Sequence, residues 1–264
     1  MGKHSTHGFT IIETMLVLAI TGLLVASLLA GIGTSIGVQR YRDSVTTLKS
    51  TLQDQYSRVT NVSNTREGTW ACDDNAIPAA TNGSGTSRGQ SDCVLLGRYI
   101  SIVDGAITTA SVVGHENTGS DGDDTELTDV ALTKQNYTFG IASESIETSV
   151  IEWGSTITLP DASAPNAFAM FILRSPTSGA LYTFTTKNTA VFAINEVSST
   201  TLKNMMIENT TEAPGQGART LCIDPDGAVV SERFSIYINA VATGPTAIES
   251  RSNSTAKSLG SPEC

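Results

Sequence analysis

The sequence holds few of the side chains that enzymes use for acid–base chemistry. Histidine occurs three times in 264 residues, and charged residues make up 16% of the chain. After the first ten residues the one remaining histidine is His115, which adjoins Glu116 in a segment that we interpret as a polar loop. No G-x-x-x-x-G-K phosphate-binding loop occurs. We therefore do not expect an enzyme.

Basic residues are also in short supply. Lysine and arginine number 16 against 26 acidic residues, and no three basic residues stand in a row. The formal net charge is −10. An acidic chain without a basic cluster repels the phosphates of nucleic acid, so we do not expect a nucleic-acid partner.

Cysteine occurs four times and never as a C-x-x-C pair, and no histidine flanks these cysteines at metal-binding spacing. A zinc site is therefore not expected. Four cysteines allow three disulfide connectivities. We favour Cys72–Cys93 with Cys222–Cys264, because each of these pairs is nearest in sequence, and the other two connectivities stay open. In the chain-entropy model, loops of these lengths stabilise a fold by about 3–4 kcal/mol each.

Two more absences mark the amino-terminal part of the chain. No proline precedes Pro78, and no charged side chain occurs from Thr14 to Gln39. At ~1.5 Å per residue a helix over this run is long enough to cross a hydrocarbon layer of ~30 Å. Glu13 lies directly before the run, and a carboxylate at the edge of lipid needs a partner or a function.

A short polar leader precedes this apolar run, and the junction between them, Gly8–Glu13, reads GFTIIE. The junction resembles the processing site of type IV prepilins and type II secretion pseudopilins. The resemblance implies that prepilin peptidase cuts after Gly8 and methylates the new amino terminus at Phe9. It also implies that Thr10 and Glu13 act in assembly, with the Glu13 carboxylate neutralising the Phe9 amine of the same or a neighbouring chain.

An ordinary secretory signal has its cleavage site after the apolar region, whereas here the candidate site precedes it. A conventional signal cleaved near Ala30 and a plain single-span anchor are the alternatives. The resemblance predicts a single-pass protein of the inner membrane with its head outside, which later enters a pilus or other extracellular filament. The implied partners are other pilin subunits, prepilin peptidase, the inner-membrane assembly platform and membrane lipid.

Apolar residues continue at steps of three and four from Val38 to Val62, which predicts an amphipathic helix that extends the span. A single helix would then run from Phe9 to Val62. The remaining chain predicts an α+β fold, in which antiparallel strands pack on the long helix. We expect four segments: a leader at 1–8, a transmembrane and assembly helix at 9–38, an amphipathic helix at 39–62, and a β-rich head at 63–264 whose carboxyl-terminal region is closed by a disulfide.

The predicted strands are bounded by glycine, proline and polar residues. They cover 93–103, 106–113, 137–141, 149–153, 167–174, 180–186, 190–194, 220–223, 228–230 and 234–241, with a short helix at 199–208. Loop is expected at 61–92 and an irregular tail at 243–264. The turn Asp224–Gly227 joins two of these strands, because proline presets φ and glycine accepts positive φ. A stretch of this kind resembles part of the H-type minor pseudopilins and FimT-like proteins.

One acidic cluster invites a metal. Asp121, Asp123, Thr125 and Asp129 offer hard oxygen ligands at alternating positions, which is a pattern that calcium accepts. The EF-hand pattern fails here, because Glu126 stands where glycine is needed and Leu132 where glutamate is needed. A solvated acidic loop is the competing interpretation, and the sequence predicts no other cofactor.

The sequence as a whole favours a type IV pilin-like structural subunit that acts by assembly. Removal of the eight-residue leader from 264 residues leaves 256, which is long for a major pilin and favours a minor pilin or pseudopilin. Adhesion, motility, secretion and DNA uptake all stay open as uses of the filament. The alternative is a membrane-anchored extracytoplasmic binding module that does not polymerise.

Overall fold

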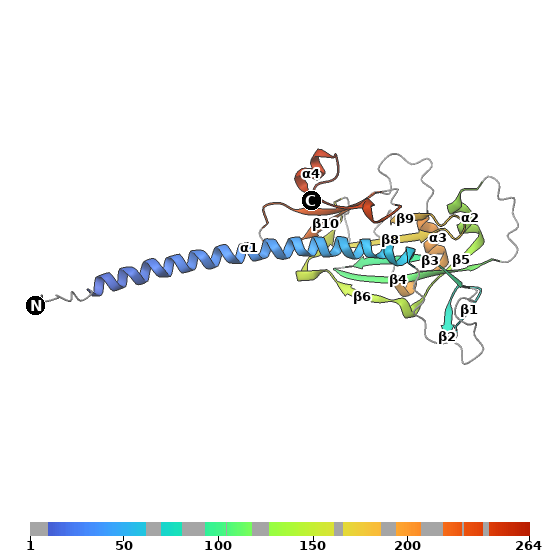
Figure 1. The fold of residues 1–264 in the computed structure, drawn as a ribbon, viewed down its shortest axis with the longest axis horizontal. Coiled ribbons are helices and arrows are strands. Elements are labelled where there is room, and N and C mark those ends of the chain that lie inside the picture. Colours follow the sequence, from blue (N-terminus) through green and yellow to red (C-terminus); the bar gives the residue numbers. More distant parts are fainter. Residues whose placement is uncertain are drawn as a thin grey trace, which may run out of the picture.

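A computed structural model describes residues 10–61, 70–80, 93–103, 105–117, 127–160, 166–185, 194–206, 219–228, 230–239 and 243–264. Its most prominent element is the helix α1 (Ile11–Thr60), of 50 residues. The first half of α1 projects from the molecule as a rod, and the second half lies against a β-rich head (Figure 1). The fold is α+β, with the long amino-terminal helix that the sequence predicts.

The larger sheet of the head has six antiparallel strands. Their order is β5-β4-β3-β8-β9, and β6 pairs with β4 beside β5. The strands are β3 (Cys93–Val103), β4 (Ala106–Glu116), β5 (Tyr137–Ile141), β6 (Glu147–Val150), β8 (Ala167–Arg174) and β9 (Leu181–Thr185). The bounds of β3, β5 and β8 are those that the sequence predicts.

A second antiparallel sheet has the order β12-β11-β10-β7. It consists of β7 (Thr156–Thr158), β10 (Arg219–Asp224), β11 (Phe234–Ile238) and β12 (Ile248–Ser252), followed by the helix α4 (Asn253–Ser258). Strands β1 (Trp70–Cys72) and β2 (Pro78–Ala80) pair with each other. The helices α2 (Asp129–Asn136) and α3 (Ser199–Met205) complete the larger elements of the described chain. Short 3-10 turns lie at η2 (Ser143–Ser145), η3 (Glu152–Gly154), η4 (Ile194–Glu196) and η5 (Pro245–Ala247).

The core forms on both faces of the larger sheet. On one face the apolar stripe of α1 packs against both sheets. This cluster comprises Tyr41, Val45, Leu48, Leu52, Tyr56 and Val59 of the helix with Ile100, Ile102, Ile107, Ile157, Phe168, Met170, Ile172, Leu221, Ile223, Ile236, Ile238 and Ile248 of the strands, together with Ile151. On the opposite face Tyr99, Phe171 and Leu202 belong to a second cluster, which α3 covers. Strand β8 is buried on both faces, which explains its unbroken apolar sequence.

Several local predictions are wrong, and each has a physical reason. The predicted strand 149–153 ends at Val150, because Trp153 and Gly154 both take positive φ and so break an extended chain. Segment 228–230 is no strand at its described residues: Ala228 donates a hydrogen bond to the Pro225 carbonyl and so extends the turn. His115 lies in β4 rather than in a loop.

Two segments expected to be irregular hold regular structure. The predicted loop 61–92 contains β1 and β2, which are only three residues each and hydrogen-bond to one another. The carboxyl-terminal tail contains η5, β12 and α4. Strand β12 lies at the edge of its sheet and buries only Ile248 fully, so its sequence is polar enough to read as irregular.

Candidate assembly helix

The amino-terminal end of α1 brings two of the predicted assembly residues into one helical turn. Thr10 is the N-cap residue, and its hydroxyl accepts a hydrogen bond from the Glu13 backbone nitrogen at 3.3 Å. This cap satisfies a backbone donor that the helix itself leaves open. Glu13 lies in the first turn and is exposed. Its carboxylate has no ion-pair partner among the described residues; Gly8 and Phe9 lie outside them.

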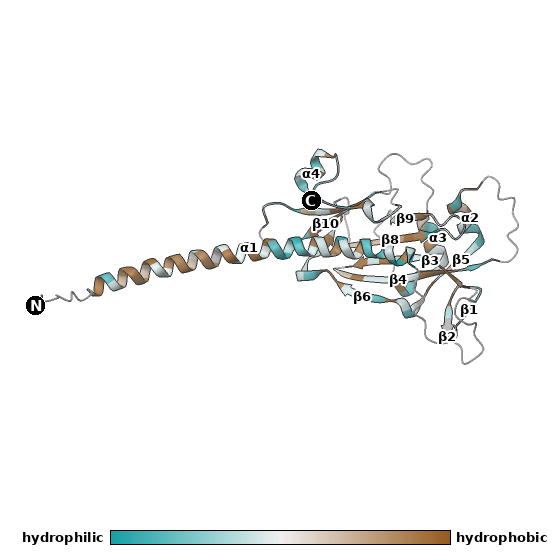
Figure 2. Ribbon diagram, in the orientation of Figure 1, coloured by the Kyte–Doolittle hydropathy of each residue, from teal (hydrophilic) through white to brown (hydrophobic). Residues whose placement is uncertain are grey.

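The first half of α1 presents apolar side chains to its surroundings on every side. Ile11 is 79% exposed and Leu23 is 72% exposed, and other large apolar side chains as far as Ile36 are exposed as well. Figure 2 shows this half of the helix as a largely brown, hydrophobic rod. A helix that is apolar all round needs a membrane or other helices to cover it. By length and composition alone, α1 is able to cross a membrane.

Hydroxyl groups within this apolar half hydrogen-bond to carbonyls of the helix itself. Thr21 donates a hydrogen bond to the Val17 carbonyl at 2.7 Å, and Ser27 donates one to the Leu24 carbonyl at 2.8 Å. Such internal bonds allow a polar side chain to lie in lipid or between packed helices without an unpaired group.

The second half of α1 is attached to the head by hydrogen bonds from buried tyrosines. Tyr41 is 2% exposed, and its hydroxyl contacts the backbone of β10 and β11. The Tyr56 hydroxyl lies 2.7 Å from the Thr183 hydroxyl on β9. Burial raises the pKa of Tyr56 to about 12, although the bond with Thr183 opposes this shift. Burial likewise raises the pKa of Tyr41, so both tyrosines stay neutral at physiological pH.

A buried arginine lies beneath the same half of the helix. Arg98 of β3 is 5% exposed, and its guanidinium donates hydrogen bonds to Gln55 on α1 and to Thr109 and Ser111 on β4. Burial lowers the pKa of Arg98, and the nearby Glu147 carboxylate opposes that shift. Glu147 in turn accepts a hydrogen bond from Arg58 of α1 at 2.8 Å. This network fixes α1 against β3, β4 and β6.

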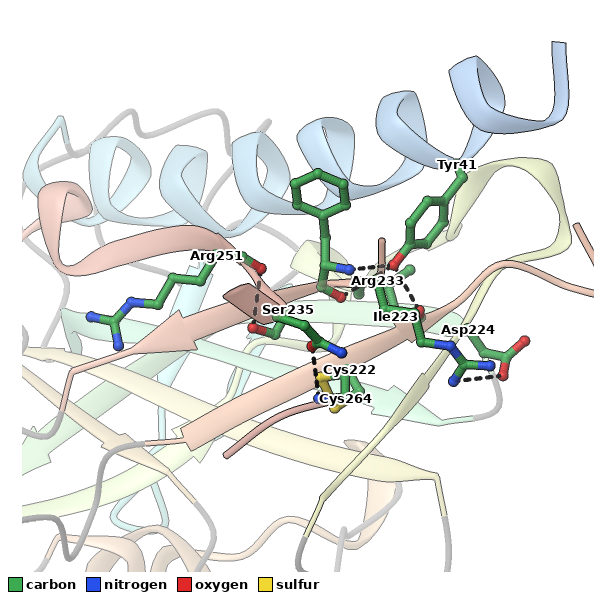
Figure 3. The surroundings of a disulfide bond; sticks show 10 residues. Tyr41, Cys222, Ile223, Asp224, Arg233, Ser235, Arg251 and Cys264 are labelled. Atoms are coloured by element: carbon green, nitrogen blue, oxygen red, sulfur yellow. Dashed lines mark hydrogen bonds and ion pairs between the residues drawn. A yellow bond between two sulfur atoms is a disulfide. The ribbon is translucent and has the colours of Figure 1, made fainter. Parts of the chain in front are cut away.

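The four cysteines form two disulfides in the structure, and each joins a cysteine to the next cysteine along the chain, as favoured from the sequence. Cys72 is bonded to Cys93, with Cα atoms 5.6 Å apart, and Cys222 is bonded to Cys264, with Cα atoms 5.5 Å apart. The second bond attaches the last residue of the chain to β10, close to Tyr41, Ile223 and Ser235 (Figure 3). The backbone nitrogen of Cys264 also donates to the Asn253 side chain at 2.8 Å.

Of the proposed calcium ligands, the structure describes only Asp129, and Asp121, Asp123 and Thr125 lie outside the described residues. Asp129 starts α2, and both of its carboxylate oxygens accept hydrogen bonds from hydroxyls. Ser175 donates to Oδ1 at 2.6 Å, while Ser178 and Tyr182 donate to Oδ2. The residues that the structure describes contain no group of three or more metal-ligating side chains. Calcium binding stays a prediction.

One prominent residue was not singled out from the sequence. It lies at the base of the head, the end from which the first half of α1 projects. Trp153 is half exposed and has a φ of 60°, and the Arg40 guanidinium lies 4.8 Å from its ring centre. The sequence signal was weak, because a tryptophan followed by glycine in a short apolar run fits a strand as well as a turn.

Comparison with known proteins bears on the amino terminus alone. A family model described as the prokaryotic N-terminal methylation motif matches residues 3–29, which is about a tenth of the chain. No curated protein and no solved structure matches the chain. The motif implies processing by prepilin peptidase. The chain thus carries the prepilin leader of type IV pilins and pseudopilins, followed by the long apolar helix α1.

Proposed function

We propose that this protein is a type IV pilin-like subunit, cut between Gly8 and Phe9, that assembles into an extracytoplasmic filament through α1. One observation carries the proposal: the methylation motif leads directly into a helix whose first half is exposed and apolar and whose second half is fixed in a folded head. The apolar first half of such a helix can be buried in a bilayer and also between neighbouring subunits of a fibre. The role is assembly rather than catalysis.

The exposed half of α1 first lies in the inner membrane and then packs against the same half of neighbouring subunits. Both environments remove about the same apolar surface from water, so transfer between them is not opposed by the hydrophobic effect. Glu13 provides an interaction that favours the filament over the membrane. Its carboxylate pairs with the Phe9 amine of an adjacent subunit, and both charges then leave lipid together.

We assign the chain to a minor pilin or pseudopilin, on the strength of its 256-residue mature length. The alternative, a membrane-anchored binding module, shares the span but has no need for a carboxylate at its start. Replacement of Glu13 therefore distinguishes the two proposed functions.

The test replaces Glu13 with glutamine and follows the protein in filaments sheared from cells. We expect Glu13→Gln to remain in the membrane fraction and to be lost from the sheared fraction. Asp43→Asn is the matched control, because Asp43 is an exposed acid on the same helix beyond the apolar run. Asp43→Asn is expected to assemble as the wild type does. Normal assembly of Glu13→Gln would rule out the proposed pairing, and absence of the wild-type protein from filaments would favour the anchored module.

A further inference from the structure

The base of the head carries an exposed tryptophan at the place where α1 enters. Gly37 of α1 lies close to the head, since a Cβ built on it would lie 3.6 Å from the Ala228 side chain. One turn further on, the Arg40 guanidinium lies over the Trp153 ring at 4.8 Å. Trp153 keeps 52% of its surface exposed despite this contact. The two side chains line an open recess of about 400 Å³ with Gly37, Pro225 and Asp226.

The backbone at Trp153 is held in a conformation that tryptophan rarely adopts. Its φ of 60° is in the left-handed region, and Gly154 follows at 71°. Contacts on either side of the pair impose this shape: the Ile151 nitrogen donates to the Gly105 carbonyl, and the Ser155 hydroxyl contacts Ser44 of α1. A bulky residue kept in a strained position and turned to the outside indicates a functional constraint.

The level of Trp153 relative to a bilayer follows from the length of α1. If Glu13 marks the inner edge of the hydrocarbon layer, about 20 residues at ~1.5 Å each bring the outer edge close to Gly33. Gly37 then stands about 6 Å beyond that edge and Arg40 about 10 Å. The headgroup layer is roughly 5–8 Å thick on each side. Gly37 therefore lies within the headgroup layer of the outer leaflet, and the backbone of Arg40 lies just beyond it. Helical side chains tilt toward the amino terminus of their helix, so the recess that Arg40 and Trp153 line with Gly37 faces this layer.

The chemistry of the pair suits this layer. An indole combines a large apolar ring with an N–H donor, and tryptophan is enriched at the membrane–water interface for that reason. A guanidinium binds phosphate through several donors. Two acidic side chains lie nearby: Glu152 precedes Trp153 in η3, and Asp226 lines the same recess. The base of the head therefore carries charges of both signs, and its binding to headgroups does not require anionic lipid.

We propose that Trp153 and Arg40 form an interfacial anchor, which holds the base of the head in the phospholipid headgroup layer of the outer leaflet before the subunit is withdrawn into a filament. The proposal rests on the membrane-inserted state of α1 in the proposed function. The anchor fixes the depth and the rotation of the head over the membrane. Trp153 and Arg40 must leave the headgroup layer when the subunit is extracted.

The chain contains two tryptophans, which makes the test direct. Trp70 lies on β1, at the opposite end of the head from the emerging helix (Figure 1). The full-length protein is reconstituted into phosphatidylethanolamine–phosphatidylglycerol vesicles that contain lipid brominated near the headgroup or deep in the acyl chain. Trp70→Phe leaves Trp153 as the single reporter, and Trp153→Phe leaves Trp70. The difference between wild type and Trp153→Phe gives the Trp153 signal even if Trp70→Phe folds poorly.

We expect shallow bromine to quench Trp153 at least threefold more strongly than Trp70, and more strongly than deep bromine does. Quenching of Trp153 no stronger than that of Trp70 would overturn the anchor. Flotation of the same vesicles reports insertion of α1 independently. Inserted protein without Trp153 quenching contradicts the anchor and leaves the proposed assembly untouched, whereas quenching of Trp153 in a protein that never enters filaments supports the anchor and contradicts assembly.

Discussion

The backbone nitrogen of Phe234 donates a hydrogen bond of 2.6 Å to the hydroxyl of Tyr41. The same hydroxyl donates to the Ile223 carbonyl at 3.1 Å, so one side chain of α1 binds the neighbouring strands β10 and β11 (Figure 3). Tyr41 is the first fully buried side chain after the exposed half of the helix. Tyr41 therefore joins the start of the buried half of α1 to the smaller sheet.

Replacement of Tyr41 by phenylalanine removes the acceptor of the Phe234 amide and leaves the ring in place. A buried donor without a partner destabilises a fold by about 1–3 kcal/mol, so we expect a loss of that size in the free energy of unfolding. Urea unfolding of the full-length protein in detergent measures it. The control is Tyr237→Phe, whose hydroxyl makes no hydrogen bond within the described chain. Equal stability of the two variants would contradict the role assigned to Tyr41.

Tyr56 predicts a loss of stability in strong alkali. Its pKa is raised to about 12 by burial, whereas a tyrosine in the unfolded chain ionises near 10. Between these two pH values Tyr56 keeps its proton in the folded state and loses it in the unfolded state. The contribution of Tyr56 to the free energy of unfolding is therefore complete below pH 10 and is lost as the pH rises towards 12. A difference of two pH units corresponds to about 3 kcal/mol. In urea unfolding at pH 9 and pH 12, Tyr56→Phe is expected to lose less stability than the wild type. Parallel losses would contradict the assignment.

The Cys222–Cys264 bond is expected to stabilise the head by attaching the tail to β10. The cysteines are 42 positions apart, and the chain-entropy model gives about 4 kcal/mol for such a loop. We expect the double variant Cys222→Ser with Cys264→Ser to lose about 2–4 kcal/mol in the free energy of unfolding. A non-reduced proteolytic digest analysed by mass spectrometry should contain the linked Cys222 and Cys264 peptides, and a link from either to Cys72 or Cys93 would show another connectivity.

Asp129 predicts a loss of stability in acid. Burial tends to raise the pKa of its carboxyl, but hydrogen bonds from Ser175, Ser178 and Tyr182 outweigh it and lower the pKa below 3.8. The stabilisation is therefore present above the unfolded pKa and is lost as pH falls through the folded one. We expect thermal unfolding midpoints below pH 4 to drop less steeply in Asp129→Asn, with Ser178→Ala intermediate. Identical slopes in all three proteins would show that these bonds do not favour the ionised form.

The parts of the fold predicted correctly are those with strong periodicity. The stripe from Tyr41 to Val59 repeats at helical spacing over six residues that are all buried, so the sequence indicates both the helix and its buried face. Strand β8 was found because both of its faces are buried, which leaves an unbroken apolar run.

The parts that were missed depend on contacts between distant segments. Strand β12 has a polar sequence and forms because β11 offers it an edge, with Ile248 opposite Ile238. Trp153 turns outward because the bonds of Ile151 and Ser155 constrain the chain on both sides, and no local pattern encodes these bonds. At the candidate site the sequence predicted Thr10 and Glu13 through the motif, but the interfacial pair Arg40 and Trp153 comes from residues over a hundred positions apart.

The most direct test of the account is the mass of the mature amino-terminal peptide. The protein is purified from its native membrane, digested and analysed by mass spectrometry. A chain that begins with N-methylated Phe9 is the predicted result, because the proposed function has prepilin peptidase cut the chain after Gly8. A chain that keeps Met1, or one that begins near Gly31 without the apolar helix, would contradict the filament function.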